Sequence, residues 1–326
     1  MIRATIGGGL VILALVFISL VVGNTEIDHN PLNWFGGVND QGDQDLEILT
    51  LSRIPRTIAL ILAGISLSVA GLIMQMLVRN KFVEPATTGT VEWASLGLLL
   101  CLIFAPGLSV IIKMVVACLF ALFGTGLFML LLQRIDIRSD AIVPLVGLIY
   151  AAVIGAAIAF VADQAELMQS IWVWIQGDFS MVLQGRYELL WFAGCLGVVA
   201  YITADQFTLA GLGKNMSENL GLNYTLVFIW GILLVSVISG ITVATVGVIP
   251  FLGLVVPNLV SLIVGDNLRY ALPWVAVTGA ALILLCDIVA RLITFPYEIP
   301  IGTIMGVIGS LLFLYLLLRS EPHGQS

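Results

Sequence analysis

The chain has 326 residues, of which 60% are hydrophobic and only 10% are charged, and its formal net charge at pH 7 is −7. Its mean hydropathy is +1.10. No soluble core needs this much apolar surface, so the composition excludes an ordinary water-soluble protein and indicates one whose solvent is largely lipid. The apolar runs are long and continuous rather than alternating, which excludes a transmembrane β-barrel and predicts membrane-spanning helices.

The first apolar run covers residues 2–23 and follows Arg3, so it could be taken for a secretory signal peptide. It is long for that purpose, and Val21-Val22-Gly23-Asn24 is a poor small-x-small cleavage site. We therefore expect a retained first helix. The polar segment 24–50 comes next and holds six acidic residues without any Lys or Arg, which favours the outer face of the membrane.

Continuous hydrophobicity predicts ten membrane spans in all. They cover residues 2–23, 55–77, 90–108, 111–132, 141–162, 187–204, 224–245, 249–264, 271–294 and 301–319. The eighth is short and contains Pro257, and the division between the third and fourth rests on Pro106-Gly107. A cytoplasmic N-terminus puts eight of the 13 Lys and Arg residues at cytoplasmic ends, which favours cytoplasmic N- and C-termini.

Two segments between spans have a different composition. Segment 164–187 contains Trp172 and Trp174 directly before Gly177-Asp178, and paired tryptophans are typical of the outer membrane–water boundary. Segment 205–223 is polar and rich in Gly and Asn, and it is long enough for two short helices on the cytoplasmic face, with helix-start residues at Asn215 and Ser217.

Sequence signatures of catalysis are missing from the chain. It has no Walker A motif, no Gly-x-Ser-x-Gly and no His-Glu-x-x-His, so we expect no enzyme activity and no use of ATP by this chain alone. If the chain is a transporter, it therefore needs an ion gradient or a partner ATPase as its energy source. The cysteines lie in apolar runs without metal-ligand spacing, so we expect no metal site, and they are Cys101, Cys118, Cys195 and Cys286.

The stretch 52–97 carries the most specific signal. It places Arg53 and Arg56 at one end of an apolar helix, Arg79-Asn80-Lys81 at the other end, and then an elbow at 85–89. Further blocks follow in order, at 174–179, 210–213, 219–222, 251–273, 286–292 and 297–302. This succession resembles the iron-chelate and vitamin B12 permease family of bacterial ABC importers, the FecCD/BtuC-like permeases.

The resemblance covers nearly the whole chain. It implies an all-α integral membrane protein with about ten transmembrane helices, the BtuC-like type II ABC importer permease fold, in a single transmembrane permease domain over 1–326. Such a permease binds no cofactor itself. It pairs with a second permease subunit, as a homodimer or heterodimer, with two ATPase subunits that bind ATP and Mg, and with an extracytoplasmic binding protein. It lies in lipid in the bacterial cytoplasmic (inner) membrane and contacts no nucleic acid.

Several departures from the family pattern narrow the expected cargo. Pro257-Asn258 stands where the family usually has Pro-His, Asn80-Lys81 stands where it usually has Asn-Pro, and Ser310 replaces a common Pro. With 88–97 and 176–190, these variants resemble the branch that imports ferric catecholate-type siderophores such as petrobactin, vibriobactin or anguibactin. We therefore expect a ferric siderophore permease. The alternatives are a permease for vitamin B12 or haem, and a proton-driven secondary transporter.

Three arginines at predicted outer helix ends oppose the positive-inside trend: Arg53, Arg56 and Arg291. They match family positions that receive acidic residues of the binding protein, and arginine suits such bidentate pairing. The alternative is that each arginine anchors a helix end or pairs internally. Arg291 follows Asp287 by four residues, so these two can meet on one helix face. Asp287 is also the buried acid that proton coupling would use.

The resemblance assigns the remaining candidate sites. It identifies 205–223 as the coupling helices that contact the ATPases, with contacts expected from Gly213, Glu218, Asn219, Leu220 and Gly221. The two glycines would allow tight turns.

Two further candidate sites concern the path of the cargo. Ser139 and Asp140 match the family's cytoplasmic gate, although either could simply be a helix N-cap. Polar or aromatic residues near the elbow and the tryptophan segment are the candidates for the translocation path, and they are Gln75, Thr88, Trp174 and Asp178.

Overall fold

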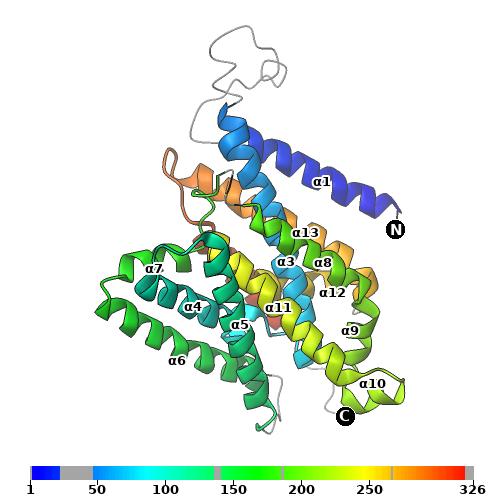
Figure 1. The fold of residues 1–326 in the computed structure, drawn as a ribbon. Helices are drawn as coiled ribbons and strands as arrows, with labels where there is room; N and C mark the ends of the chain where they lie inside the picture. The colour runs from blue at the N-terminus through cyan, green and yellow to red at the C-terminus, as the bar shows by residue number, and fades with distance from the viewer. Residues whose placement is uncertain are drawn as a thin grey trace.

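A computed structural model describes residues 2–22, 47–135, 141–183, 185, 187–265 and 267–319. Within these residues all regular structure is helical, and no strand is present. The helices form one packed bundle with α1 lying along one side of it (Figure 1).

All ten predicted spans are helices. They are α1 (Ile2–Val21), α3 (Ile54–Val78), α4 (Thr90–Phe104), α5 (Val110–Leu132), α6 (Ile142–Gln164), α8 (Leu189–Ile202), α11 (Tyr224–Val246), α12 (Leu252–Val264), α13 (Leu268–Ile293) and α14 (Ile301–Arg319). Six of them are long and apolar enough to cross a membrane alone, and α8 reaches this length with α9 (Ala204–Ala210), to which it is bent by 65°. The chain is thus a multi-pass membrane protein.

Three smaller elements were not predicted. A π-helical turn, η2 (Leu49–Arg53), leads straight into α3, and a 3-10 turn, η3 (Pro85–Thr88), forms the elbow before α4. The segment with the paired tryptophans contains a short helix, α7 (Met168–Ile175). Eight residues are too few for hydrophobic periodicity to separate a helix from an interfacial loop.

Local chemistry fixes several helix ends. Gly89 precedes α4 with φ of 76° and Gly247 follows α11 with φ of 84°, a backbone conformation that glycine adopts without steric cost. The side chain of Asn223 caps α11 by accepting from the backbone N–H of Leu226 at 3.1 Å. These helix boundaries therefore follow from residues that sequence reading can recognise.

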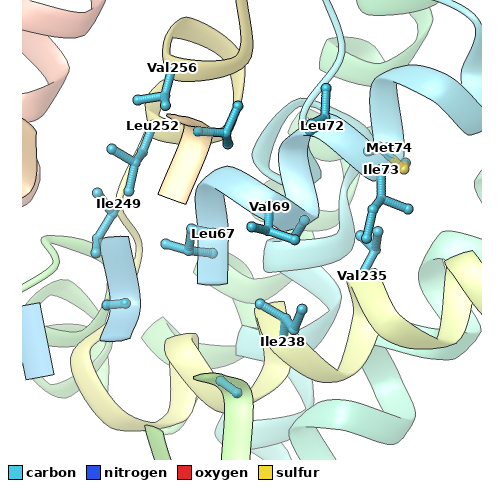
Figure 2. Packing of buried hydrophobic residues seen from close by; sticks show 14 of the residues in the cluster. Leu67, Val69, Leu72, Ile73, Met74, Val235, Ile238, Ile249, Leu252 and Val256 are labelled. Carbon is cyan, nitrogen blue, oxygen red and sulfur yellow. The ribbon is translucent and has the colours of Figure 1, made fainter. Parts of the chain in front are cut away.

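Helix α3 lies at the centre of the bundle, where it packs against α8, α11, α12 and α13. In the most apolar stretch of the continuous helix Leu49–Val78, 83% of residues are buried, against 22% for α6 at the periphery. Figure 2 shows aliphatic side chains of α3 facing those of α11 and the start of α12, among them Leu67, Val69, Ile73, Val235, Ile238 and Leu252.

Glycines let the helix backbones around α3 come close together. A Cβ added to Gly71 of α3 would overlap the backbone of Gly253 in α12. A Cβ added to Gly64 would lie 2.7 Å from the carbonyl oxygen of Gly279 in α13. Because lipid supplies little hydrophobic driving force between membrane helices, such small-residue contacts hold the bundle together by close packing.

Candidate functional site

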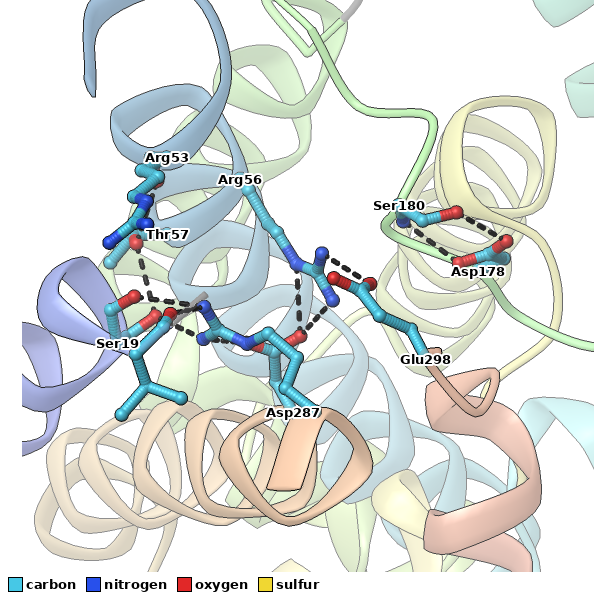
Figure 3. Close-up of polar contacts among 10 residues, drawn as sticks. Ser19, Arg53, Arg56, Thr57, Asp178, Ser180, Asp287 and Glu298 are labelled. Carbon is cyan, nitrogen blue, oxygen red and sulfur yellow. Dashed lines mark hydrogen bonds and ion pairs between the residues drawn. The ribbon is translucent and has the colours of Figure 1, made fainter. Parts of the chain in front are cut away.

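A cluster of charged side chains lies where α3 begins (Figure 3). Arg56 donates to Oδ1 of Asp287 from Nε at 3.0 Å and from Nη2 at 2.6 Å. Its Nη1 donates to Oε2 of Glu298 at 2.7 Å. One guanidinium therefore joins α13 to the segment between α13 and α14.

Two other arginines bind the C-terminal end of α1. Arg291 pairs with Oδ2 of Asp287 and donates to the carbonyl oxygen of Ser19 at 2.9 Å and to that of Val22. Nη1 of Arg53 donates to the carbonyl oxygens of Leu20 and Val21, at 2.6 and 2.8 Å. The last carbonyls of a helix have no partners within the helix and carry partial negative charge, so these arginines cap α1.

Burial makes this cluster part of the protein interior. The exposed fractions are 6% for Arg53, 9% for Arg56, 3% for Arg291 and 0% for Asp287. The pairing expected from the spacing of Asp287 and Arg291 is confirmed, and all three arginines have internal partners. This geometry matches internal pairing, the alternative raised above. Docking of a binding protein on these residues stays a prediction.

The described ion pairs of the cluster share its carboxylates between two arginines. Glu298 pairs with Arg56, and Asp287 pairs with both Arg56 and Arg291. Asp287 contacts two arginines, so its negative charge is stabilised in the structure. Asp287 therefore joins α3 to α13 through its two arginine partners, and its use in proton coupling stays a prediction.

The segment 205–223 forms two short helices, as predicted: α9 and α10 (Lys214–Asn219). They lie at the opposite end of the bundle from the start of α3 (Figure 1). Gly213 and Gly221 have φ of 96° and 84°, which confirms the tight turns. Leu220 and Met216 are 62% and 60% exposed. The segment therefore presents apolar side chains at its surface.

The start of α10 was predicted wrongly. The helix begins after Gly213, so Asn215 lies within its first turn and Ser217 lies in its middle. Ser217 is buried, and its hydroxyl donates to the carbonyl oxygens of Leu209 and Gly213, both at 2.7 Å. This side chain thus joins α10 to α9 instead of capping α10. Serine can bond either way, so its identity alone does not settle its role.

The path candidates Gln75 and Thr88 are buried and bonded within the protein. Pro257 has no N–H, so it cannot bond the carbonyl of Gly253 within α12. Nε2 of Gln75 lies 3.4 Å from that carbonyl oxygen and takes the place of the missing donor. The hydroxyl of Thr88 hydrogen-bonds that of Thr90 at 3.1 Å. Gln75 thus stabilises α12, and Thr88 stabilises the elbow. Their role in the translocation path stays a prediction.

Asp178 lines a cavity of about 270 Å³, which Lys113 of α5 and Thr245 of α11 also line. Its carboxylate accepts from the backbone N–H and the hydroxyl of Ser180, at 2.8 and 2.7 Å (Figure 3). Trp174 belongs to α7, but its side chain is outside the described part of the protein.

The gate candidates Ser139 and Asp140 lie outside the described residues. Their assignment as the cytoplasmic gate, and the alternative that one of them caps α6, both stay predictions.

Sequence analysis missed the role of Glu84. This residue is 3% exposed, and its carboxylate accepts from the backbone N–H of Phe251 at 2.9 Å, directly before α12. Nδ2 of Asn258 donates to the carbonyl oxygen of Lys81 at 2.7 Å. This bond uses the backbone carbonyl of Lys81, so it does not depend on the side chain at that position, and no local sequence signal pointed to it.

Comparison with known proteins assigns the family. Residues 11–319 match the model of the FecCD transport family. The chain belongs to this family. Because the match leaves out only the ends of the chain, the family assignment made from the motifs is confirmed.

Relatives cover almost the same length. The petrobactin import system permease protein YclN of Bacillus subtilis (strain 168) is 46% identical over 314 residues, which are 96% of this chain and 97% of the relative. The petrobactin import system permease protein FatD of Bacillus anthracis is 43% identical over 292 residues, 89% of this chain and 87% of the relative.

A solved structure shows the same fold. It is an inward-facing conformation of a metal-chelate type ABC transporter, which superimposes with a TM-score of 0.82 over 98% of this chain and 100% of that one, at 24% identity. The predicted all-helical type II ABC importer permease fold is confirmed.

Proposed function

We propose that this chain is the membrane-spanning permease subunit of an ABC importer that brings a ferric siderophore of the petrobactin type into the cytoplasm. The observation that carries the proposal is 46% identity to a petrobactin import permease over 96% of the chain. In this proposal the cargo crosses as the intact chelate, so the permease supplies no metal ligands. Rocking of helix bundles, not bond chemistry, moves it.

The proposed complex contains a second permease subunit, two ATPase subunits and an extracytoplasmic siderophore-binding protein. ATP and Mg bind to the ATPases, and this chain has no enzyme activity of its own. Support comes from α9 and α10, which present Leu220 and Met216 to solvent. The 65° bend between α8 and α9 connects this surface directly to a span, so movement of an ATPase would reach the bundle.

The proposed location is the bacterial cytoplasmic (inner) membrane, with both termini in the cytoplasm. This orientation puts α9 and α10 on the side where ATP is available. It also puts the arginine cluster at the outer end of α3, which the acidic segment 24–50 directly precedes in the sequence.

Uptake of radiolabelled iron by cells lacking this gene tests the proposal. The panel holds ferric petrobactin, other catecholate, hydroxamate and citrate-type chelates, haem and labelled vitamin B12. We expect selective loss of ferric petrobactin uptake, restored by a plasmid copy of the gene. Loss of haem or vitamin B12 uptake alone would overturn the cargo while keeping the fold. Uptake that survives loss of the ATPase but stops with the proton gradient would overturn the ABC mechanism.

Docking of the binding protein is proposed at Arg56. Its side chain is 11% exposed, and that of its partner Glu298 is 19% exposed, so Glu298 is the carboxylate that an incoming acidic residue can replace. Close charge pairs at interfaces couple strongly. The buried pair with Asp287 would remain and hold the guanidinium in place.

Replacing Glu298 by Gln should therefore tighten capture of the binding protein, because a competing internal carboxylate is removed. We expect a Kd lower by roughly three- to tenfold, measured by surface capture of the nanodisc-embedded transporter. Asp163→Asn is the control, since Asp163 is exposed at the end of α6 on the same proposed face. An unchanged or higher Kd for Glu298→Gln would place Arg56 in the internal cluster only.

A further inference from the structure

An apolar groove of about 490 Å³ lies between α3, α8 and α13. Its walls include Leu62, Ile65 and Val69 of α3, Val198 of α8 and Leu272 of α13. Almost none of its lining surface is polar, and one side is open. Water would find no hydrogen-bond partners there, so the groove is not a water cavity.

A glycine opens the groove. Gly197 leaves the face of α8 hollow and Pro273 of α13 also lines the groove, whereas Gly194 lets Leu62 of α3 pack closely against α8. A Cβ added at Gly197 would meet only Ile65, at 3.8 Å. The groove follows α8 from Trp191 to Tyr201, which at the helical rise of 1.5 Å per residue is about 15 Å.

The surroundings indicate what enters the groove. α3 and α13 are long apolar spans, and α8 completes a span with α9, so the medium at the open side is the hydrocarbon core of the bilayer. The groove has the length of a dozen methylene groups and offers no charge, which suits an acyl chain. A ferric siderophore carries charge and polar groups, and the groove gives these no partner.

Polar groups gather at one end of the groove. Tyr201, which lines it, is 45% exposed, and Tyr270 is 55% exposed. Both lie within electrostatic reach of Arg269, whose side chain is 59% exposed. Nη1 of Arg269 pairs with Asp205 of α9, but a guanidinium has five N–H donors. The others are available to a second anion, and interfacial tyrosines are common where headgroups lie.

We propose that this groove holds one acyl chain of a phospholipid of the cytoplasmic leaflet, with the lipid phosphate against Arg269. The acyl chain fills the hollow left by Gly197, and the phosphate binds the free face of the guanidinium. The site lies on α8, the helix that continues into the proposed coupling segment. A bound lipid would therefore support the wall next to the α8–α9 bend.

Photocross-linking tests this site in the full-length protein. The probe is phosphatidylglycerol with a diazirine in one acyl chain, present in trace amount in nanodiscs of phosphatidylethanolamine and phosphatidylglycerol. Peptide mapping should find cross-links concentrated on 191–201 and 272–276. Gly197→Leu, which fills the groove, should lower them by roughly tenfold, the change that 1.4 kcal/mol of lost affinity produces. Val198→Trp covers the groove from its exposed edge, so the same loss of cross-links is expected. This variant replaces Gly197→Leu if Gly197→Leu fails to fold.

Matched variants elsewhere serve as controls. Gly126→Leu and Leu130→Trp introduce the same larger side chains in α5, away from the groove. A Cβ built on Gly126 has no atom within 4 Å, and Leu130 is 60% exposed. Neither should alter groove labelling. Labelling of α8 that equals labelling of α5, or that survives both groove variants, would overturn the acyl-chain site.

The phosphate contact has its own readout. A diacylglycerol with the same diazirine chain lacks the phosphate, so it should label the groove less than the phosphatidylglycerol probe does. Arg269→Gln should bring the phosphatidylglycerol signal down to the diacylglycerol level. Equal labelling by the two probes in the wild-type protein would overturn the assignment of the headgroup to Arg269.

Discussion

Replacing Asp287 by alanine should lower the free energy of unfolding by about 3–5 kcal/mol, the usual cost of removing one member of a buried ion pair. Asp287 is completely buried and contacts both Arg56 and Arg291. Without it, two guanidiniums would remain in a low-dielectric interior with too little negative charge. The attachment of α1 should weaken as well, because Arg291 also binds the end of that helix.

An SDS titration of the full-length protein in mixed micelles, followed by circular dichroism, measures this loss. Asp205→Asn is the matched control, because Asp205 also pairs with an arginine, but the two side chains are 57% and 59% exposed. Water screens such a pair, so the control should unfold like the wild-type protein. Identical curves for Asp287→Ala and Asp205→Asn would contradict a central role for Asp287.

A second comparison separates charge from packing. Asp287→Asn keeps nearly the same volume and removes the charge, so most of the destabilisation should remain. Adding Arg291→Gln to Asp287→Asn removes one unpaired cation and should restore part of the stability. A double variant that is less stable than Asp287→Asn by the full effect of Arg291→Gln alone would show that the two charges act independently.

Sequence alone located the ten apolar helices, because a lipid-embedded helix is specified by its own apolar run. Even α12 was found, although it has 13 residues and an internal proline. The apolar run itself does not show how the helix tolerates Pro257. Gln75 binds the carbonyl oxygen of Gly253 that Pro257 leaves without a donor, and these two residues are 178 positions apart. Contacts over such separations depend on how the helices pack.

In the charged cluster, too, the sequence predicts the local contact but not the distant ones. Asp287 and Arg291 are four residues apart on one helix, so their pairing follows from helix geometry. Arg56 lies 231 residues from Asp287, and no local rule connects the two. The sequence therefore predicted the residues and one of the pairs. It could not show that the arginines also hold α1, because that depends on where α1 packs.

Replacing Gly71 by alanine should destabilise the protein by more than about 3 kcal/mol, beyond the usual range for an overpacked core. The added Cβ would overlap the backbone of Gly253, and two helix backbones cannot make room without moving apart. Separation of α3 from α12 would also break the bonds that Glu84 and Gln75 make to the start of α12. The expected result is little folded protein after purification.

The sign of this effect separates packing from helix propensity. Alanine favours a helix over glycine by about 1 kcal/mol, so propensity alone predicts that Gly71→Ala stabilises α3. Gly126→Ala supplies the comparison, since a Cβ there meets nothing within 4 Å and stability should stay the same or rise slightly. Gly279→Ala should resemble Gly71→Ala, because a Cβ at Gly279 would overlap Ser68 of α3. If Gly71→Ala matched Gly126→Ala in the SDS titration, α3 and α12 would not be held by direct backbone contact, and the central packing described for this bundle would be wrong.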